Sequence, residues 1–189
     1  AAPVAALVAA GSVAVAVHTS GQARPLPYVP LINPTDLAVA LGLAACARWW
    51  LRLRASDLAL PDAARSPRIA QGLALMGFVA LNTVWLRVAH HYGGVPWRMD
   101  DLAGSFLVQA GYSILWTLVS LGLMFIGHRR RQRPVWTAGA GLLGLTLIKL
   151  FLVDLSNRGG SERIIVFIAV GALMLVIGYL APLPPKAAT

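Results

Sequence analysis

The chain alternates between long apolar stretches and short polar or proline-rich connections. Apolar runs of about 17 to 25 residues with few charges have the length that crosses a bilayer as a helix. The pattern predicts six such spans, at residues 2–17, 34–51, 67–90, 102–127, 135–153 and 163–180. We therefore expect an all-α fold, a polytopic transmembrane bundle of about six helices in three hairpins.

Proline marks several of the expected helix boundaries. Residues 24–34 contain repeated proline, which forbids a regular helix and favours extended backbone. Asn33 before Pro34 and Ser66 before Pro67 each predict a helix start, with a capping side chain followed by proline in the first turn. The proline-rich residues 182–185 cannot continue the last helix.

Composition supports a membrane protein and excludes other classes. The chain is 58% hydrophobic and 12% charged, whereas soluble domains carry about 25% charged residues. Its net charge of +9 is not a nucleic-acid signal, because the basic residues lie in short loops between apolar runs. The single cysteine, Cys46, excludes an internal disulfide, and we expect it to pack as a small apolar residue.

The Lys and Arg residues are distributed unevenly between the two sets of loops. One side collects ten of them: Arg48, Arg52, Arg54, Arg65, Arg68, Arg129, Arg130, Arg131, Arg133 and Lys186. The other side collects five: Arg24, Arg87, Arg98, Arg158 and Arg163. Because cytoplasmic loops are the more basic, both chain ends are expected in the cytoplasm and residues 90–91 outside, in the periplasm of a Gram-negative cell.

The chain begins directly in an apolar run, without an initiator Met or the basic segment of a signal peptide. We interpret it as the C-terminal fragment of a longer polytopic protein. The expected partners are membrane lipid, upstream transmembrane helices of the same protein and other membrane subunits.

The candidate chemistry is concentrated at the end of the third expected span, in residues 81–101. Asn82 and His90 lie on one helical row, and Arg87 and His91 lie on the adjacent row. A polar face in a membrane must point to protein or water. One interpretation is an outward pocket with a histidine as proton donor or acceptor and Arg87 as an anion clamp. The alternative is interfacial anchoring, with Arg87 and both histidines reaching headgroups or water.

The turn that follows holds Trp97, a candidate substrate contact, and two carboxylates. Asp100 and Asp101 suit the positive end of the next helix, although either would also be able to orient a histidine. Adjacent histidines diverge on a helix and no third ligand is evident, so we expect no metal and no cofactor.

Polar residues also recur in the fourth and fifth spans. Gln109 and Ser113 belong to a polar stripe along 109–120 that either forms interhelical hydrogen bonds or lines a polar path toward Asn82 and Arg87. Lys149, near the outer boundary, either snorkels or pairs. Asp154 is expected in an ion-pair network with Arg158, Glu162 and Arg163, or in an anion or sugar site.

Three sets of segments together resemble the C-terminal part of a bacterial predicted-membrane-protein family, the domain-of-unknown-function family twenty-three thirty-nine. The first is LPYVPLINPTDL at 26–37; the second runs from residue 81 through GVPW at 94–97 to SILWT at 113–117; the third comprises KLFLVDLS at 149–156, residues 163–164 and GYLAPLP at 178–184. The resemblance implies a bacterial inner-membrane protein with many further helices upstream. It implies no reaction.

The leading functional hypothesis is a membrane module that handles a lipid-linked or glycan envelope substrate, or a polar solute, through an outward pocket. The alternatives are a structural or accessory subunit without chemistry and a transporter. Whether the chain is an enzyme stays open at this level. In the leading hypothesis Asn82, Arg87, His90 and His91 are the reactive residues, and the substrate contacts are Gln109, Ser113, Trp97 and Lys149.

Overall fold

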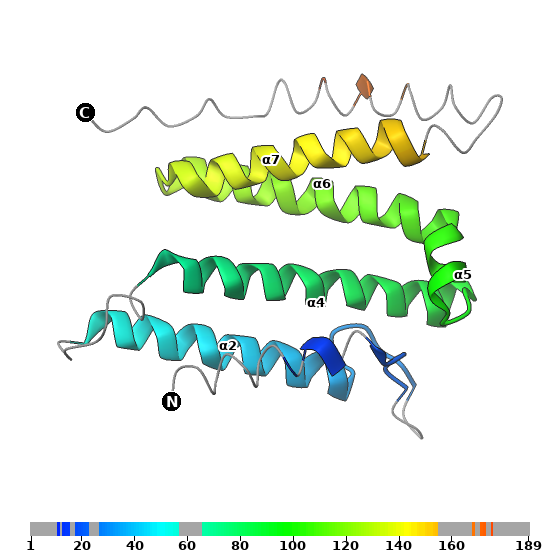
Figure 1. Cartoon of the computed structure of the whole chain (residues 1–189), viewed down its shortest axis with the longest axis horizontal. Helices are drawn as coiled ribbons and strands as arrows, with labels where there is room; N and C mark the ends of the chain where they lie inside the picture. The colour runs from blue at the N-terminus through cyan, green and yellow to red at the C-terminus, as the bar shows by residue number, and fades with distance from the viewer. Residues whose placement is uncertain are drawn as a thin grey trace. The chain divides into compact units, whose positions relative to one another are not determined.

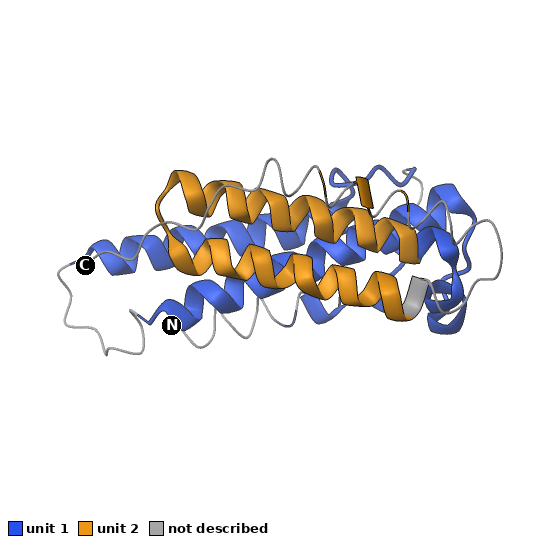
Figure 2. Cartoon of the chain, turned by 90° about the horizontal axis from the view of Figure 1, so that it is seen from above, with its two compact units in different colours: residues 1–108 blue, residues 109–189 orange. Residues whose placement is uncertain are grey.

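The computed structural model describes residues 11, 13–15, 18–22, 27–56 and 66–154, with positions 168, 171, 172 and 175. The described elements are helical, as predicted (Figure 1). The chain divides into two compact units, residues 1–108 and 109–189 (Figure 2). The expected spans at 2–17 and 163–180 lie almost wholly outside the described residues.

Unit 1 is built on two long helices, α2 (Pro34–Ala55) and α4 (Pro67–Gly93), which pack against each other (Figure 1). Both predicted helix starts are confirmed. The Asn33 side chain accepts from the Thr35 N–H at 2.9 Å, and the Ser66 hydroxyl accepts from the Arg68 N–H at 3.2 Å. The third expected helix runs three residues past His90 and ends at Gly93, and the left-handed backbone of Gly94 (φ 67°) caps it.

The fourth expected helix is divided, which the apolar pattern did not indicate. A short helix, α5 (Met99–Gly104), comes first, and α6 (Phe106–Arg129) follows after Ser105, whose backbone is extended. The indole N–H of Trp85 in α4 donates to the carbonyl of Val108 at 3.2 Å. This bond ties the start of α6 to α4 within unit 1.

Unit 2 contains most of α6 together with α7 (Arg133–Lys149), which continues into the π-helical turn η1 (Leu150–Asp154). Met124 and Leu143 form the buried core of this pair, with Leu121, Trp136 and Ala140 packed around them. The helices approach so closely that a Cβ on Gly139 would lie 2.7 Å from the Ser120 carbonyl oxygen. The sequence did not predict the change from α- to π-helix after Lys149.

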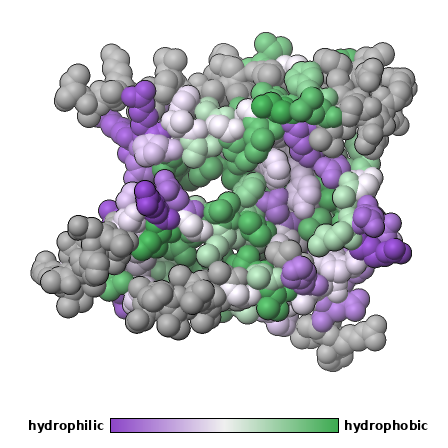
Figure 3. Space-filling view, in the orientation of Figure 1, coloured by the Kyte–Doolittle hydropathy of each residue, from purple (hydrophilic) through white to green (hydrophobic). Residues whose placement is uncertain are grey.

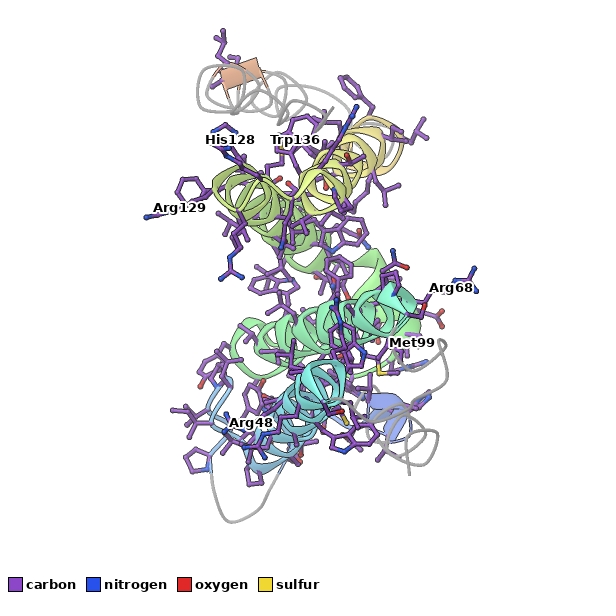
Figure 4. The ribbon with its side chains drawn as sticks, turned by 90° about the vertical axis from the view of Figure 1, so that its left-hand side faces the viewer. Arg48, Arg68, Met99, His128, Arg129 and Trp136 are labelled. Carbon is purple, nitrogen blue, oxygen red and sulfur yellow. The ribbon has the colours of Figure 1, made fainter. Side chains whose placement is uncertain are left out.

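Three of the described helical segments are long and apolar enough to cross a membrane: Pro67–Gly93, Phe106–Arg129 and Arg133–Leu152. α2 is less apolar, because Asp36 lies in its first turn and Arg52 and Arg54 in its last. Apolar side chains cover much of the helix surface in Figure 3, and many hydrophilic ones gather toward the helix ends. Arg68 extends away from the start of α4, and Arg129 from the end of α6 (Figure 4).

Candidate functional site

One polar row of α4 turns inward, toward α2 and the loop before it. Thr83 is 3% exposed and Arg87 only 1%, and His91, two turns on from Thr83, is half-buried. Arg87 therefore does not snorkel to the membrane surface, and interfacial anchoring is the wrong interpretation for this residue. It is the largest of the described side chains that are fully buried.

The Arg87 guanidinium is satisfied by α2 and by the segment that precedes it. Its Nη1 forms an ion pair with Oδ1 of Asp36, in the first turn of α2. Nε donates to the Thr19 carbonyl at 3.1 Å, and Nη2 donates to the Thr19 hydroxyl at 3.2 Å. A buried charge is tolerated only when paired and hydrogen-bonded, so these contacts are what permit Arg87 to be there.

Tyr28 binds the other oxygen of the Asp36 carboxylate. Its hydroxyl donates to Oδ2 of Asp36 at 3.1 Å. Burial, followed by the negative charge of Asp36 and this hydrogen bond, raises the pKa of the Tyr28 hydroxyl above its usual value. The phenol therefore stays protonated and keeps donating to the carboxylate.

The loop that carries these groups is closed by its own polar contacts. The Asn33 amide donates to the carbonyl of Gly21 at 2.6 Å, while its oxygen caps α2. Gly21 has a left-handed backbone (φ 74°), and a Cβ there would lie 3.0 Å from Cδ of Arg87. The left-handed backbone favours glycine, and a Cβ there would also press against the Arg87 side chain.

The two histidines bind different carbonyl groups. Nδ1 of His90 lies 2.7 Å from the Val95 carbonyl oxygen, and Nε2 of His91 lies 2.8 Å from the Ser20 carbonyl oxygen. A carbonyl cannot donate, so each of these nitrogens carries the proton in the neutral ring. The lone pairs then belong to Nε2 of His90 and Nδ1 of His91, which are the atoms suited to accept from a ligand hydroxyl.

An aromatic cluster surrounds the histidines. His91 stacks on Tyr28 with ring centroids 4.4 Å apart, and His90 meets the edge of Trp97 at 5.6 Å. Tyr92 donates its hydroxyl to the Tyr28 carbonyl at 2.7 Å while remaining 64% exposed. Trp97 thus contacts His90, and Tyr92 offers an exposed ring beside them.

A cavity of about 180 Å³ lies between α2 and α4, next to this ion pair. Its lining is mainly apolar and includes Val39, Leu43, Ala80 and Val84; its polar contributors are Asp36, Thr83 and Arg87. Along α2 it extends from Asp36 to Leu43, about 10 Å by the rise of an α-helix. Its volume is below the roughly 300–1,000 Å³ of pockets that enclose a small-molecule ligand, so it suits the end of an apolar chain.

Asn82 and Asp101 have other partners than those considered from the sequence. The Asn82 amide donates to the Phe78 carbonyl of its own helix at 2.7 Å, away from the Arg87 row. Asp101 forms an exposed ion pair with Arg98 at 3.7 Å, and not with a histidine. Asp100 and Asp101 do lie in the first turn of α5.

The remaining candidates come together in unit 2. Nζ of Lys149 donates to the Gln109 carbonyl and to the Ser113 hydroxyl, both at 2.9 Å. Lys149 therefore forms hydrogen bonds within the protein, and these bonds join the end of α7 to α6. Ser113 of the polar stripe therefore bonds to a residue of α7, and not to the third expected span. Gln109 lies in a different unit from Asn82 and Arg87. The proposed network of Asp154, Arg158, Glu162 and Arg163 lies outside the described side chains.

Asp36, Tyr28 and Thr19 were missed as site residues. The usable signal was Asp36 itself, because a carboxylate at the start of a membrane helix needs a cationic partner. Among the described residues, no group of three or more His, Cys, Asp or Glu could hold a metal ion.

The family model described as "Predicted membrane protein (DUF2339)" matches residues 1–184. No curated protein and no solved structure matches the chain significantly.

Proposed function

The chain belongs to the DUF2339 family of predicted membrane proteins and is an integral membrane protein, and from this premise we propose that it binds a lipid-linked envelope substrate. The observation that carries the proposal is the apolar cavity between α2 and α4, which meets the buried Arg87–Asp36 pair. A carbon chain would enter the cavity from the bilayer. The polar part of the substrate would lie against the histidines and the exposed ring of Tyr92.

The ion pair favours an uncharged polar group, such as a sugar, at the inner end of this site. Arg87 and Asp36 neutralise each other, and the pair also bonds to Thr19 and Tyr28. Aromatic rings with a polar edge contact ligands at low entropic cost, and the lone pairs assigned to His90 and His91 can accept from hydroxyl groups. Arg87 is therefore a positioning residue in this proposal, and no longer the anion clamp expected from the sequence.

Filling the cavity tests this proposal directly. Gly77 lines it, and a Cβ there meets no atom within 4 Å, so the first atom of the new side chain in Gly77→Leu is accommodated and the rest of the side chain occupies the cavity. We expect loss of cross-linking to a photoreactive polyisoprenyl or acyl lipid. Gly72→Leu is the matched control, because it lies in the same helix with equally open surroundings and does not line the cavity. Equal cross-linking of both variants would refute lipid binding in the cavity.

The histidines supply a second test. Replacing His90 and His91 together with Ala removes both acceptors while leaving the cavity lining intact. In this proposal, lipid cross-linking persists and any envelope phenotype of the gene is lost. A fully functional, correctly inserted double variant would exclude a role for these two rings.

The second candidate function is a structural or accessory subunit, assembled with upstream helices or other membrane subunits. It is favoured by the self-contained pairing of Arg87 with Asp36 and Thr19. Copurification with a larger complex in fixed stoichiometry, together with normal function of Gly77→Leu, would support it over substrate binding.

We also propose a bacterial inner-membrane location with both chain ends cytoplasmic and the histidines periplasmic. After Cys46→Ser, a cysteine at exposed Tyr92 should react with an impermeant maleimide in spheroplasts. A cysteine at exposed Arg130, beyond α6, should react only after lysis. The opposite result would invert the topology.

A further inference from the structure

The last turns of α2 combine one buried aromatic side chain with several exposed cations. Trp50 is 7% exposed and is the one buried residue in the second half of this helix. Arg48, Arg52 and Arg54 around it are exposed. This end of α2 is opposite to the end that carries Asp36, and so it is separate from the cavity and the histidines (Figure 1).

The indole N–H of Trp50 has no acceptor within the described part of the chain. Its Nε1 atom is buried and makes no hydrogen bond there. An unsatisfied buried donor costs about 1–3 kcal/mol, and indole can only donate. Native proteins seldom leave such a group unpaired, so the N–H indicates an acceptor that comes from outside the described chain.

A charged group that lies over this indole is also only a donor. The Arg54 guanidinium lies over the Trp50 ring, 4.8 Å from its centroid. None of Arg48, Arg52 and Arg54 forms an ion pair with a carboxylate that the structure describes. The Ser56 hydroxyl donates to the carbonyl oxygen of Leu53 at 2.7 Å. This nearby oxygen is therefore already bonded to another donor. An oxyanion beside Arg54 would satisfy the guanidinium and the indole N–H together.

We infer that Trp50 and Arg54 bind the phosphate group of an anionic membrane lipid. Trp and Arg at a helix end mark the membrane interface, and basic pockets on that side take anionic headgroups. The three arginines favour an anionic lipid over a zwitterionic one. In this proposal the exposed Arg54 side chain turns so that one phosphate group contacts both the guanidinium and the indole N–H.

The test measures lipid retention by the full chain in nanodiscs, by native mass spectrometry, with phosphatidylglycerol against phosphatidylcholine. Trp50→Phe keeps the ring and removes the N–H, and Arg54→Gln removes the charge. Each should weaken retention of phosphatidylglycerol about tenfold, as loss of one charge-assisted hydrogen bond implies. Trp49→Phe and Arg52→Gln are the matched controls, since both residues are exposed neighbours on the same helix.

Three results would overturn the inference. The first is retention by Trp50→Phe equal to that by Trp49→Phe. The second is equal retention of the two lipids by the unmodified protein, which would mean that charge plays no part. The third is displacement of bound lipid by millimolar inorganic phosphate, which would make this a site for free phosphate. Retention that falls in Trp50→Phe and Arg54→Gln alone would establish the lipid site.

Discussion

The α2/α4 pair and the α6/α7 pair are held together by different kinds of interaction. α6 and α7 approach closely at Gly127 and Gly139, where an added Cβ would strike the backbone of the other helix. α2 and α4 leave a cavity of about 180 Å³ between them and are joined at one end by a buried ion pair. Lipid supplies little hydrophobic force between helices. One pair therefore relies on close packing, and the other on a polar connection that leaves room for a ligand.

The largest effect should come from breaking the ion pair. Asp36→Ala leaves Arg87 buried without its counter-charge, and we expect destabilisation by about 3–5 kcal/mol. Unfolding in mixed micelles by added SDS measures this loss. Arg98→Ala is the control, because its pair with Asp101 is exposed (77% and 43%) and should contribute at most about 1 kcal/mol. Similar losses in both variants would mean that the buried pair does not join α2 to α4.

Enlarging a glycine should damage the closely packed pair by a smaller amount. In Gly139→Ala the new Cβ would lie 2.7 Å from the Ser120 carbonyl oxygen and 2.9 Å from the Met124 nitrogen. Because these are backbone atoms, the helices must separate, at a cost of about 1–3 kcal/mol. Gly141→Ala, with nothing within 4 Å of its Cβ, should be neutral in the same SDS titration. The comparison fails if Gly139→Ala is equally neutral.

Removing the Tyr28 hydroxyl should cost about 1 kcal/mol near neutral pH, where the phenol donates to Asp36. The raised pKa of Tyr28 adds a dependence on pH. Below pH 10 the phenol is protonated in both states. Above it the unfolded state releases the proton first, so the free energy of unfolding falls as pH rises.

Tyr28→Phe should therefore lose less stability than the unmodified protein as the pH rises above 10. Tyr92→Phe controls for general alkaline effects, because Tyr92 is 64% exposed. Parallel pH curves for the unmodified protein and Tyr28→Phe would show that this hydroxyl is not protected in the folded state.

The smallest effect should come from the polar connection in unit 2. Ser113→Ala removes the hydroxyl that accepts from Lys149 and leaves the Gln109 carbonyl as an acceptor, and interhelical hydrogen bonds in membranes average about 0.6 kcal/mol. Thr137→Ala is the control, since its hydroxyl bonds only within its own helix and is exposed. A loss above about 2 kcal/mol for Ser113→Ala would make α6/α7 as dependent on polar contacts as α2/α4.

Local features were predictable because their causes are local. Asn33–Pro34 and Ser66–Pro67 specify helix starts within a few residues, and both starts are confirmed. The helical fold class follows from the length of the apolar runs and is also confirmed. The π-turn after Lys149 is not visible in the hydropathy pattern, because apolar side chains continue through residues 150–153. The break at Ser105 falls at the pair Gly104–Ser105, a combination that can kink a helix, but the apolar pattern by itself did not indicate it.

The site was only partly predictable, because it joins distant parts of the chain. Helical spacing placed Arg87 and His91 on one row, but it gave no information about their partners. Asp36 lies 51 residues before Arg87, and Thr19 lies 68 residues before it. Asp36 follows the predicted helix start at Asn33–Pro34, and nothing in the neighbouring sequence marks its partner. Neither periodicity nor charge counting can identify such a pairing in a single sequence.

Gly21 lies at the point where the loop before α2 meets Arg87. A Cβ there would lie 3.0 Å from Cδ of Arg87, the backbone has a left-handed conformation that few other residues adopt, and the Gly21 carbonyl accepts from the Asn33 amide. The segment around it also supplies Thr19, whose carbonyl and hydroxyl oxygens accept hydrogen bonds from Arg87. A bulkier residue at position 21 would strain the backbone and press on the arginine. This single glycine therefore links the conformation of the loop to the burial of a charge in the membrane protein's interior.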